Sequence, residues 1–255
     1  GSEKAIAAEK RRIFSYFDGN QTALIYEKEP FFDYLSEQVQ GSIVPYGPDS
    51  TKGFESFTEQ GLEGSVLRLD GTDIHISLIG KHNLINCLAA VAVAHSFDIN
   101  TREIKEGLEK SHALFGRGEV VEGDVTVIRD CYNANPESFR EAVRFFNRLQ
   151  TEGKKIAIVG PMNELGEFAE SAHEELGELL ASSDCSMVLF IGEATFPAYE
   201  IVRQFGSGIE SYWSNDLDEL RDIIVPKIRA GDCVLLKGSR TAELEKIGDA
   251  LSAIE

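Results

Sequence analysis

The fold of this chain can be worked out from one stretch, Asp130-Cys131-Tyr132-Asn133-Ala134-Asn135-Pro136-Glu137-Ser138. A β-branched run at residues 125–128 precedes it and predicts a buried strand. Apolar residues at helical spacing follow it and predict a helix, with Asn135 as its cap and Pro136 in its first turn. The connection also displays Asp130, Tyr132 and Asn133. Because a strand-to-helix turn needs only one cap, this surplus of polar and aromatic groups indicates a functional site.

The sequence after Gly118 alternates between strand-like and helix-like segments. Strands are predicted at residues 125–128, 156–159, 187–191, 209–212 and 233–236. Helices are predicted to begin near Pro136, Phe168, Thr195, Asp216 and Arg240. This alternation predicts an α/β domain with a Rossmann-like, largely parallel sheet and helices on both faces. Ligands of such sheets gather at the carboxyl ends of the strands, where the opening stretch lies.

The sequence before Gly118 has a more mixed pattern. Helices are predicted at residues 4–17 and 30–37, strands at 22–26 and 42–46, and a β-like segment at 53–79 with a hairpin turn at Asp70-Gly71. A broad apolar helix follows at 81–97, and then a helix at 102–110 that Thr101 caps. Residues 111–118 lack periodicity, so we expect one domain at 1–117 and a second at 118–255.

Composition excludes several classes of protein. The chain has 255 residues, enough for one large domain or two ordinary ones. Its formal net charge of −18 argues against general binding to nucleic acid or to an anionic membrane. No run approaches the roughly 18 apolar residues of a membrane span. The four cysteines are far apart, without zinc or redox spacing, and reduced buried thiols fit a cytoplasmic protein. Gly1-Ser2 resembles a tag remnant, which suggests a piece of a longer chain.

The helix predicted at 81–97 opens with His82, Asn83 and Asn86. The two asparagines are three residues apart, so their amides share one face of the first turn. An amide both donates and accepts hydrogen bonds, which suits the edge of an adenine. Helix capping by His82 or Asn83 is the alternative, and locally it is the simpler explanation.

Three further residues could contact a nucleotide. Arg117, between two glycines, could reach phosphate oxygens as the domains close, or it could be an exposed linker side chain. Asp130 at a strand end could accept hydrogen bonds from both ribose hydroxyls. Tyr132 could pack against a base. A plain turn would leave the last two residues unexplained.

The strand predicted at 233–236 is followed by Lys237-Gly238-Ser239-Arg240, two cations and a serine at a helix start. They predict a carboxylate or phosphate pocket, with solvated charges as the alternative. Gly160 to Gly166 is not a G-x-G-x-x-G loop, so a dinucleotide fingerprint is not supported. His173 is expected to be structural. Spacing alone thus predicts an α/β protein that binds a nucleotide or another anion.

Taken in order, these motifs resemble the Mur ligases, the ATP-dependent amide-forming enzymes of peptidoglycan synthesis. The resemblance is carried by His82-Asn83-Leu84-Ile85-Asn86, Gly116-Arg117, Asp130 through Pro136 with Ser138, Met162 with Glu164-Leu165-Gly166, His173, and Lys237-Gly238-Ser239-Arg240. Together they extend over roughly two-thirds of the chain. The runs Tyr132 to Pro136 and Glu164 to Gly166 resemble the branch of the family that adds D-alanyl-D-alanine.

The resemblance implies that residues 1–117 are the back half of a central ATPase domain and 118–255 a C-terminal domain. It implies ATP and Mg²⁺ as cofactors, with the P-loop and the Mg²⁺ ligands upstream. UDP-N-acetylmuramoyl-tripeptide and D-alanyl-D-alanine would be the substrates, joined through an acyl phosphate. The isolated chain would be inactive. We expect a monomer, with no nucleic-acid partner and no membrane insertion.

The resemblance also implies site residues, and none of them is a metal ligand. The ATP-binding set is His82, Asn83, Asn86, Arg117 and Asp130, and Arg117 would also be catalytic. Tyr132 joins this set because its ring could pack against the base. The dipeptide set is Asn133, Asn135, Glu164 and Ser239. The sequence departs from the branch at Arg129, Cys131 and Pro161, where Asp, Ser or Thr, and Asp are usual. These departures remove no implied ATP contact, and they concern the dipeptide contacts and the loop geometry.

Three alternatives differ from this interpretation. A folylpolyglutamate synthase shares the domain plan, but Asn133-Ala134-Asn135-Pro136 and Glu164-Leu165-Gly166 argue against it. A non-catalytic nucleotide-binding module is a second alternative, and it requires a native chain that never had a P-loop. A dinucleotide oxidoreductase is a more distant possibility because the glycine fingerprint is missing.

Overall fold

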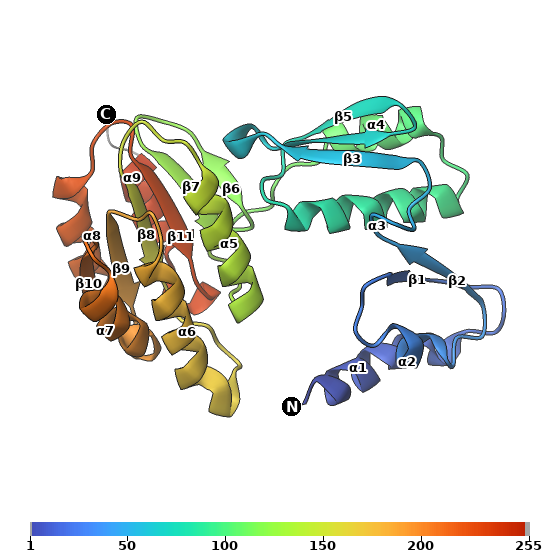
Figure 1. Ribbon diagram of the computed structural model, residues 1–255, viewed down its shortest axis with the longest axis horizontal. Helices are drawn as coiled ribbons and strands as arrows, with labels where there is room; N and C mark the ends of the chain where they lie inside the picture. The colour runs from blue at the N-terminus through green and yellow to red at the C-terminus, as the bar shows by residue number, and fades with distance from the viewer. Residues whose placement is uncertain (1, 253–255) are drawn as a thin grey trace. The chain divides into compact units, whose positions relative to one another are not determined.

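The computed structural model describes residues 2–252, which form two compact units (Figure 1). Within these residues the first unit takes 2–60, 65–77 and 81–111, and the second takes 61–64, 78–80 and 112–252. The chain therefore enters the second unit for the last time after residue 111. These units are defined by contacts, and the domain boundary predicted between residues 117 and 118 stays a prediction.

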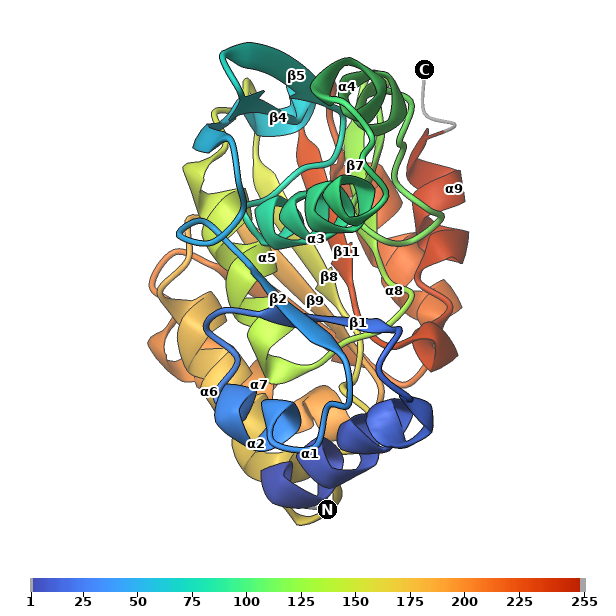
Figure 2. The same ribbon diagram turned by 90° about the vertical axis from the view of Figure 1, so that its right-hand side faces the viewer.

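The amino-terminal part of the first unit is a small α/β layer. Helix α1 (Glu3–Arg11) continues into a 3₁₀ turn (Arg12–Tyr16), and the parallel strands β1 (Thr22–Tyr26) and β2 (Ser42–Tyr46) flank α2 (Phe32–Ser36) in sequence. Figures 1 and 2 show α1 and α2 on the same side of the two strands. The buried side chains Ala23, Ile25 and Leu35 join these elements into one core.

The rest of the first unit surrounds one long helix. Strands β3 (Phe54–Glu59), β4 (Ser65–Leu69) and β5 (Thr72–Ile76) form an antiparallel sheet in that order. The predicted hairpin turn is confirmed, because Asp70 and Gly71 join β4 to β5 with φ of +47° and +72°. Helix α3 (His82–Ser96) lies between this sheet and the β1–β2 pair (Figures 1 and 2).

Helix α4 (Thr101–Glu109) packs on β5 and begins one residue earlier than predicted. Its cap is Asn100 rather than Thr101, so that prediction was wrong. The Asn100 side chain accepts a hydrogen bond from the Glu103 N–H at 3.1 Å, and the Glu103 carboxylate bonds back to the N–H of Asn100. Thr101 is already helical, and its hydroxyl donates to Asp70 at 2.8 Å instead.

The second unit is a six-stranded sheet in the order β10-β9-β8-β11-β7-β6. The strands are β6 (Glu119–Val121), β7 (Thr126–Asp130), β8 (Lys155–Val159), β9 (Met187–Ile191), β10 (Glu210–Ser214) and β11 (Cys233–Lys237). All neighbouring pairs are parallel except β6–β7, so the predicted largely parallel sheet is confirmed. The edge strand β6 was not predicted, because its three half-buried residues show no apolar run.

Helices cover both faces of this sheet, as predicted. One face carries α5 (Pro136–Arg148), α6 (Ala169–Ala181) and α7 (Phe196–Phe205), and the other carries α8 (Leu217–Ile224) and α9 (Glu245–Ser252). Successive strand residues alternate between the two cores, as Leu235 and Leu236 do. The helix predicted near Arg240 is a 3₁₀ turn (Arg240–Ala242), and α9 starts only after Glu243, whose φ is +48°.

Candidate functional site

The carboxyl ends of three neighbouring strands meet at one edge of the sheet. The β11 register places Lys237 opposite Asp130 of β7 on one side and Val159 of β8 on the other. The loops that follow β8 and β11 touch through glycines, since a Cβ on Gly238 would lie 2.7 Å from the Cα of Gly160. This edge therefore brings together the loop at 131–135 and the motif at 237–240, two segments that the sequence singled out separately.

Lys237 is the buried cation of this site. Its side chain is only 1% exposed, and its Nζ lies 2.8 Å from Oδ2 of Asp130. The same ammonium group donates to the carbonyl oxygen of Asn133 at 3.2 Å and lies 5.4 Å from the centre of the Phe139 ring. The alternative of a solvated charge is therefore wrong for Lys237. Arg240, by contrast, is exposed.

Asp130 is paired and still accessible. Its side chain is 26% exposed although Lys237 beside it is buried. Within residues 2–252, no protein group donates a hydrogen bond to its second oxygen, Oδ1. A carboxylate in this state has a neutralising cation on one oxygen and acceptor capacity left on the other.

The loop after β7 is built by its own side chains. The Asn135 side chain accepts from the Ser138 N–H at 2.8 Å, and the Ser138 hydroxyl accepts from the Asn135 N–H at 3.1 Å. The cap predicted at Asn135 is thus confirmed. The Asn133 side chain accepts from the Ala134 N–H at 2.9 Å. Both amide oxygens hold the loop, so a ligand contact from these exposed asparagines would use their NH₂ groups.

Two arginines lie against one exposed aromatic ring. The Arg117 guanidinium carbon is 4.2 Å from the Tyr132 ring centre, and that of Arg240 is 5.6 Å from the same centre. Tyr132 also donates its backbone N–H to the Gly116 carbonyl at 3.0 Å, which ties the connection before β6 to the loop after β7. No carboxylate of the described chain pairs with either guanidinium. The arrangement therefore offers positive charge beside a flat apolar surface.

The loop after β8 is tied to the loop after β11. The Asn163 N–H donates to the Ser239 hydroxyl at 3.2 Å, and the Asn163 side chain donates to Thr241 at 3.0 Å. Ser239 is buried, at 3% exposure, and its N–H donates to the Pro161 carbonyl. Ser239 therefore links the loop after β11 to the loop after β8. Glu164 is exposed in the left-handed region, with φ of +63°.

His173 has the structural role that we expected. It is fully buried in α6, where its Nε2 accepts from the Met162 N–H at 3.1 Å and its Nδ1 donates to the Ala169 carbonyl at 2.7 Å. Burial lowers the pKa of His173 from its ordinary value, because the charged imidazolium loses hydration. The neutral ring therefore fixes the start of the loop after β8.

The asparagines predicted to contact adenine lie in the first unit, in the first turn of α3. Their amides do share one face, since the Asn86 side chain donates to Oδ1 of Asn83 at 2.9 Å. Asn83 is buried, whereas His82 and Asn86 are exposed. The N-cap position is Lys81, so neither His82 nor Asn83 occupies it and the capping alternative is wrong. Adenine binding here stays a prediction.

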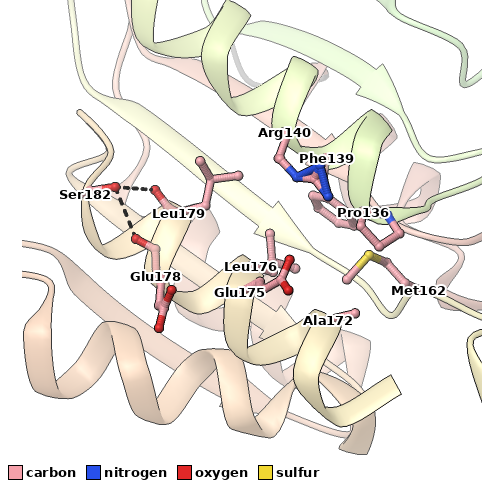
Figure 3. Close-up of a pocket in the computed structure, with 10 residues that line it drawn as sticks. All are labelled: Pro136, Phe139, Arg140, Met162, Ala172, Glu175, Leu176, Glu178, Leu179 and Ser182. Atoms are coloured by element: carbon pink, nitrogen blue, oxygen red, sulfur yellow. Dashed lines mark hydrogen bonds between the residues drawn. The ribbon is translucent and has the colours of Figure 1, made fainter. Parts of the chain in front are cut away.

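A groove runs between α5 and α6 (Figure 3), and of its lining only Pro136 and Met162 belong to motifs that the sequence singled out. Its volume is about 350 Å³. Phe139, Met162 and Leu176 give it an apolar floor, and Arg140 and Glu175 also line it.

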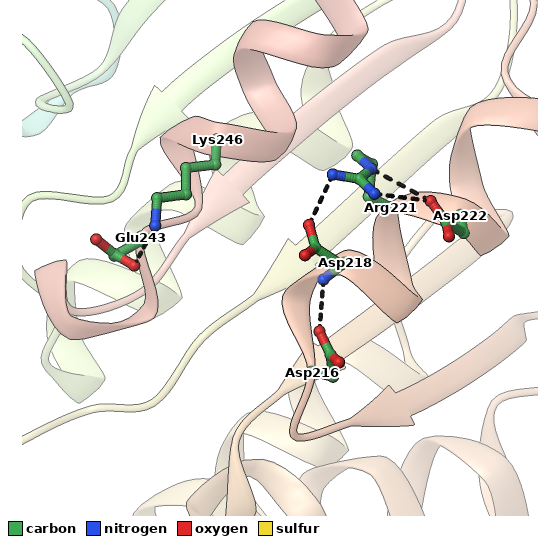
Figure 4. A network of polar contacts seen from close by, with 6 residues as sticks. All are labelled: Asp216, Asp218, Arg221, Asp222, Glu243 and Lys246. Atoms are coloured by element: carbon green, nitrogen blue, oxygen red, sulfur yellow. Dashed lines mark hydrogen bonds and ion pairs between the residues drawn. The ribbon is translucent and has the colours of Figure 1, made fainter.

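On the other face of the sheet, exposed ion pairs join Arg221 of α8 to two aspartates and Lys246 of α9 to Glu243 (Figure 4). Solvent screens such exposed pairs, so they contribute little to stability.

Some kinds of site are absent from the part of the chain that the structure describes. No group of three or more His, Cys, Asp or Glu side chains could hold a metal ion there. Between residues 2 and 252, no helix has both the length and the apolar character that crossing a membrane requires. All four cysteines are free and buried, and burial raises the pKa of Cys131 to about 11 and that of Cys233 to about 12. Neither of these two thiols is therefore an activated nucleophile.

Comparison with known proteins identifies both halves of the chain. Residues 1–94 match the Mur ligase middle domain, and residues 116–240 match the Mur ligase glutamate ligase domain. A UDP-N-acetylmuramoyl-tripeptide–D-alanyl-D-alanine ligase of Treponema pallidum is 32% identical over 247 residues, which cover 97% of this chain and 53% of the relative. The chain thus spans about half the length of the curated relatives that it matches.

Solved structures show the same fold. The MurF ligase of Thermotoga maritima, a complex with ADP, superposes with a TM-score of 0.80 at 24% identity, over 99% of this chain and 58% of that one. A folylpolyglutamate synthase of Mycobacterium tuberculosis gives a lower TM-score, 0.69, at 16% identity, over 100% of this chain and 61% of that one. The two domain matches and the 32% identity to the Treponema ligase show that this chain belongs to the Mur ligase family.

Proposed function

We propose that the full-length protein is an ATP-dependent ligase of peptidoglycan synthesis that joins D-alanyl-D-alanine to UDP-N-acetylmuramoyl-tripeptide. ATP binding is inferred from the Asp130 carboxylate, which has one oxygen paired with Lys237 and the other accessible, and which lies beside the Arg117–Tyr132 pair. It combines an acceptor for ribose hydroxyls, a flat face and a cation for phosphate. The substrate part rests on the name of the Treponema relative and on the Asn133-Ala134-Asn135-Pro136 run.

The proposed reaction has two steps. The terminal phosphoryl group of ATP passes to the tripeptide carboxylate, which gives an acyl phosphate and ADP. The amine of D-alanyl-D-alanine then attacks the acyl carbon, and the tetrahedral intermediate expels inorganic phosphate and loses a proton. Arg117 would stabilise the negative charge of the transferring phosphoryl group, which is the main task of a protein in this chemistry.

The other proposed contacts divide between the two units. In the first unit His82, Asn83 and Asn86 would support and contact adenine through the exposed face of the first turn of α3. In the second unit Asn133, Asn135, Glu164 and Ser239 would border the dipeptide. The exposed carboxylate of Glu164 suits the dipeptide ammonium, and Ser239 would act mainly by holding Asn163.

Magnesium is proposed as a cofactor of the full-length protein, but the described residues offer no cluster that fits it. We therefore assign none of its ligands to this part of the chain. We also propose that the protein is a monomer in the cytoplasm, where the four free buried thiols would remain reduced. The 255-residue chain alone is expected to be inactive.

The test is a substrate comparison with the full-length protein. ATP and Mg²⁺ are supplied with either UDP-N-acetylmuramoyl-tripeptide and D-alanyl-D-alanine or a folate and glutamate, and product mass and phosphate release are measured. We expect turnover only with the first pair. Turnover only with the second pair would favour the folylpolyglutamate synthase type, and ATP binding without turnover of either pair would favour a non-catalytic module. ATP hydrolysis with the first pair by the 255-residue chain alone would contradict its expected inactivity.

A further inference from the structure

We propose that Lys237 is a positioning residue for the nucleotide, a role that rests on the proposed function. At 1% exposure the lysine is too buried to touch a ligand in this structure. Its effect would pass through Asp130, whose carboxylate it holds in one orientation. The class of ligand is a nucleoside polyphosphate, bound through its ribose hydroxyls.

The surroundings of Lys237 explain why it must act through a partner. Lys237 is two residues beyond Leu235, so both side chains point to the sheet face that α5 covers, and its Nζ lies over the Phe139 ring. An ammonium group on an apolar face has lost most of its hydration, which is unfavourable unless an opposite charge compensates. The carboxylate of Asp130, 2.8 Å away, is that charge.

The three acceptors of Lys237 all belong to one short segment. The Asp130 carboxylate lies at 2.8 Å, the Asn133 carbonyl at 3.2 Å and the Asp130 carbonyl at 3.5 Å. The ammonium group thereby ties both ends of the segment 130–133 to the end of β11. The Asp130 side chain cannot turn away without leaving a buried charge unpaired. Its second oxygen is therefore held ready for a ligand.

Lys155 provides a matched control at the opposite end of the neighbouring strand. It is the first residue of β8, its side chain is 11% exposed, and its Nζ donates to the Asn147 carbonyl at 2.7 Å. It too is a nearly buried lysine that bonds to backbone, but it lies at the amino end of the strand, away from the proposed site. Its replacement tests what the loss of a buried lysine does by itself.

The experiment uses the full-length protein and the variants Lys237→Met, Lys237→Arg, Asp130→Asn, Asp130→Asn/Lys237→Met and Lys155→Met. Affinity for ATP is measured by calorimetry, and KM and kcat by phosphate release. We expect Lys237→Met to weaken ATP binding by about tenfold or more, as the loss of an oriented charged hydrogen bond does. The KM for D-alanyl-D-alanine should change less, and Lys237→Arg should restore part of the affinity for ATP.

The double variant gives the sharpest outcome, because it removes both charges together and leaves no unpaired ion to unfold the protein. If Lys237 acts through Asp130, ATP binding by the double variant should be no weaker than by Asp130→Asn alone. The proposal would be overturned if the losses of ATP affinity in the two single variants multiplied in the double variant. It would also be overturned if Lys237→Met bound ATP as tightly as the wild type. So would an equal loss of ATP affinity in Lys155→Met.

The same measurements separate this inference from the proposed function. If the wild-type protein ligates the dipeptide while Lys237→Met keeps its affinity for ATP, only the role of Lys237 fails. If the wild-type protein binds ATP but does not ligate the dipeptide, and Lys237→Met binds ATP more weakly, the ligase function fails and the positioning role stands. A wild-type protein that binds no ATP would overturn both.

Discussion

The two ends of β11 each bury an ionised side chain, and they do so differently. At the amino end Asp232, 3% exposed, accepts hydrogen bonds from the backbone N–H groups of Lys154 at 2.7 Å and Arg229 at 2.8 Å. At the carboxyl end Lys237, 1% exposed, pairs with the side chain of Asp130, which is 26% exposed. The first charge is enclosed by backbone, and the second is joined to a group that still reaches solvent.

The difference shows that burial of a charge does not by itself mark a functional site. The bonds of Asp232 join the backbone at Lys154 to the backbone at Arg229, and its side chain is almost fully buried. Lys237 instead fixes a partner that retains an unused acceptor. The exposure of the partner distinguishes a positioning charge from a structural one, and variants at both ends of β11 can test this distinction.

The largest effect is expected from breaking the pair at the carboxyl end. In the 255-residue chain, Asp130→Ala leaves the buried Lys237 without an opposite charge, so it should lower the free energy of unfolding by about 3–5 kcal/mol. Lys237→Met should cost less, because the carboxylate that remains can reach water. Urea unfolding followed by circular dichroism measures both values. A larger loss of stability in Lys237→Met than in Asp130→Ala would contradict this account of the pair.

A smaller loss of stability is expected at the amino end. Asp232→Ala removes the acceptor of two part-buried backbone N–H groups and should lower the free energy of unfolding by about 1–3 kcal/mol. Asp232→Asn keeps one acceptor oxygen, so its free energy of unfolding should lie between those of Asp232→Ala and the wild type. In the full-length protein, neither change should alter the affinity for ATP. A marked loss of ATP affinity in Asp232→Ala would remove the functional contrast between the two ends.

The labelling rates of two neighbouring cysteines should show which end of β11 unfolds locally in each of these variants. Cys131 follows Asp130 and Cys233 follows Asp232, and both thiols are buried with raised pKa values. A thiol reagent should therefore label neither of them quickly in the wild-type chain. Asp130→Ala should accelerate the labelling of Cys131 more than that of Cys233, and Asp232→Ala should do the reverse.

The smallest effect concerns a third buried ionisable group, His173 in the helix after β8. Its pKa in the folded state lies below the ordinary value of 6.5, so the unfolded chain binds the proton more tightly. The stability that its neutral form contributes is complete above about pH 6.5 and is lost as the pH falls below that value. Urea unfolding as a function of pH should show a shallower decline for His173→Gln. An unchanged decline would assign the pH dependence to other groups.

The sequence alone determined the order of elements and the place where a site would form. Periodicity is a local property, so it predicted five of the six strands in the second unit and the cap at Asn135. It did not predict β6, whose three residues are held by pairing with β7. It also misplaced the cap of α4, because Asn100 and Thr101 are both good caps, and only the structure shows that the Thr101 hydroxyl bonds to Asp70 instead.

What only the tertiary structure decided is which charges meet. Lys237 and Asp130 are 107 residues apart, and the parallel register of β11 and β7 makes them neighbours. The sequence placed Lys237 in an anion pocket because two cations at a strand end suit that role. The structure buries this lysine against Asp130 and leaves Arg240 exposed beside Tyr132. Local pattern predicts that polar groups gather at a strand end, but long-range packing determines whether each one pairs inside the protein or remains open to a ligand.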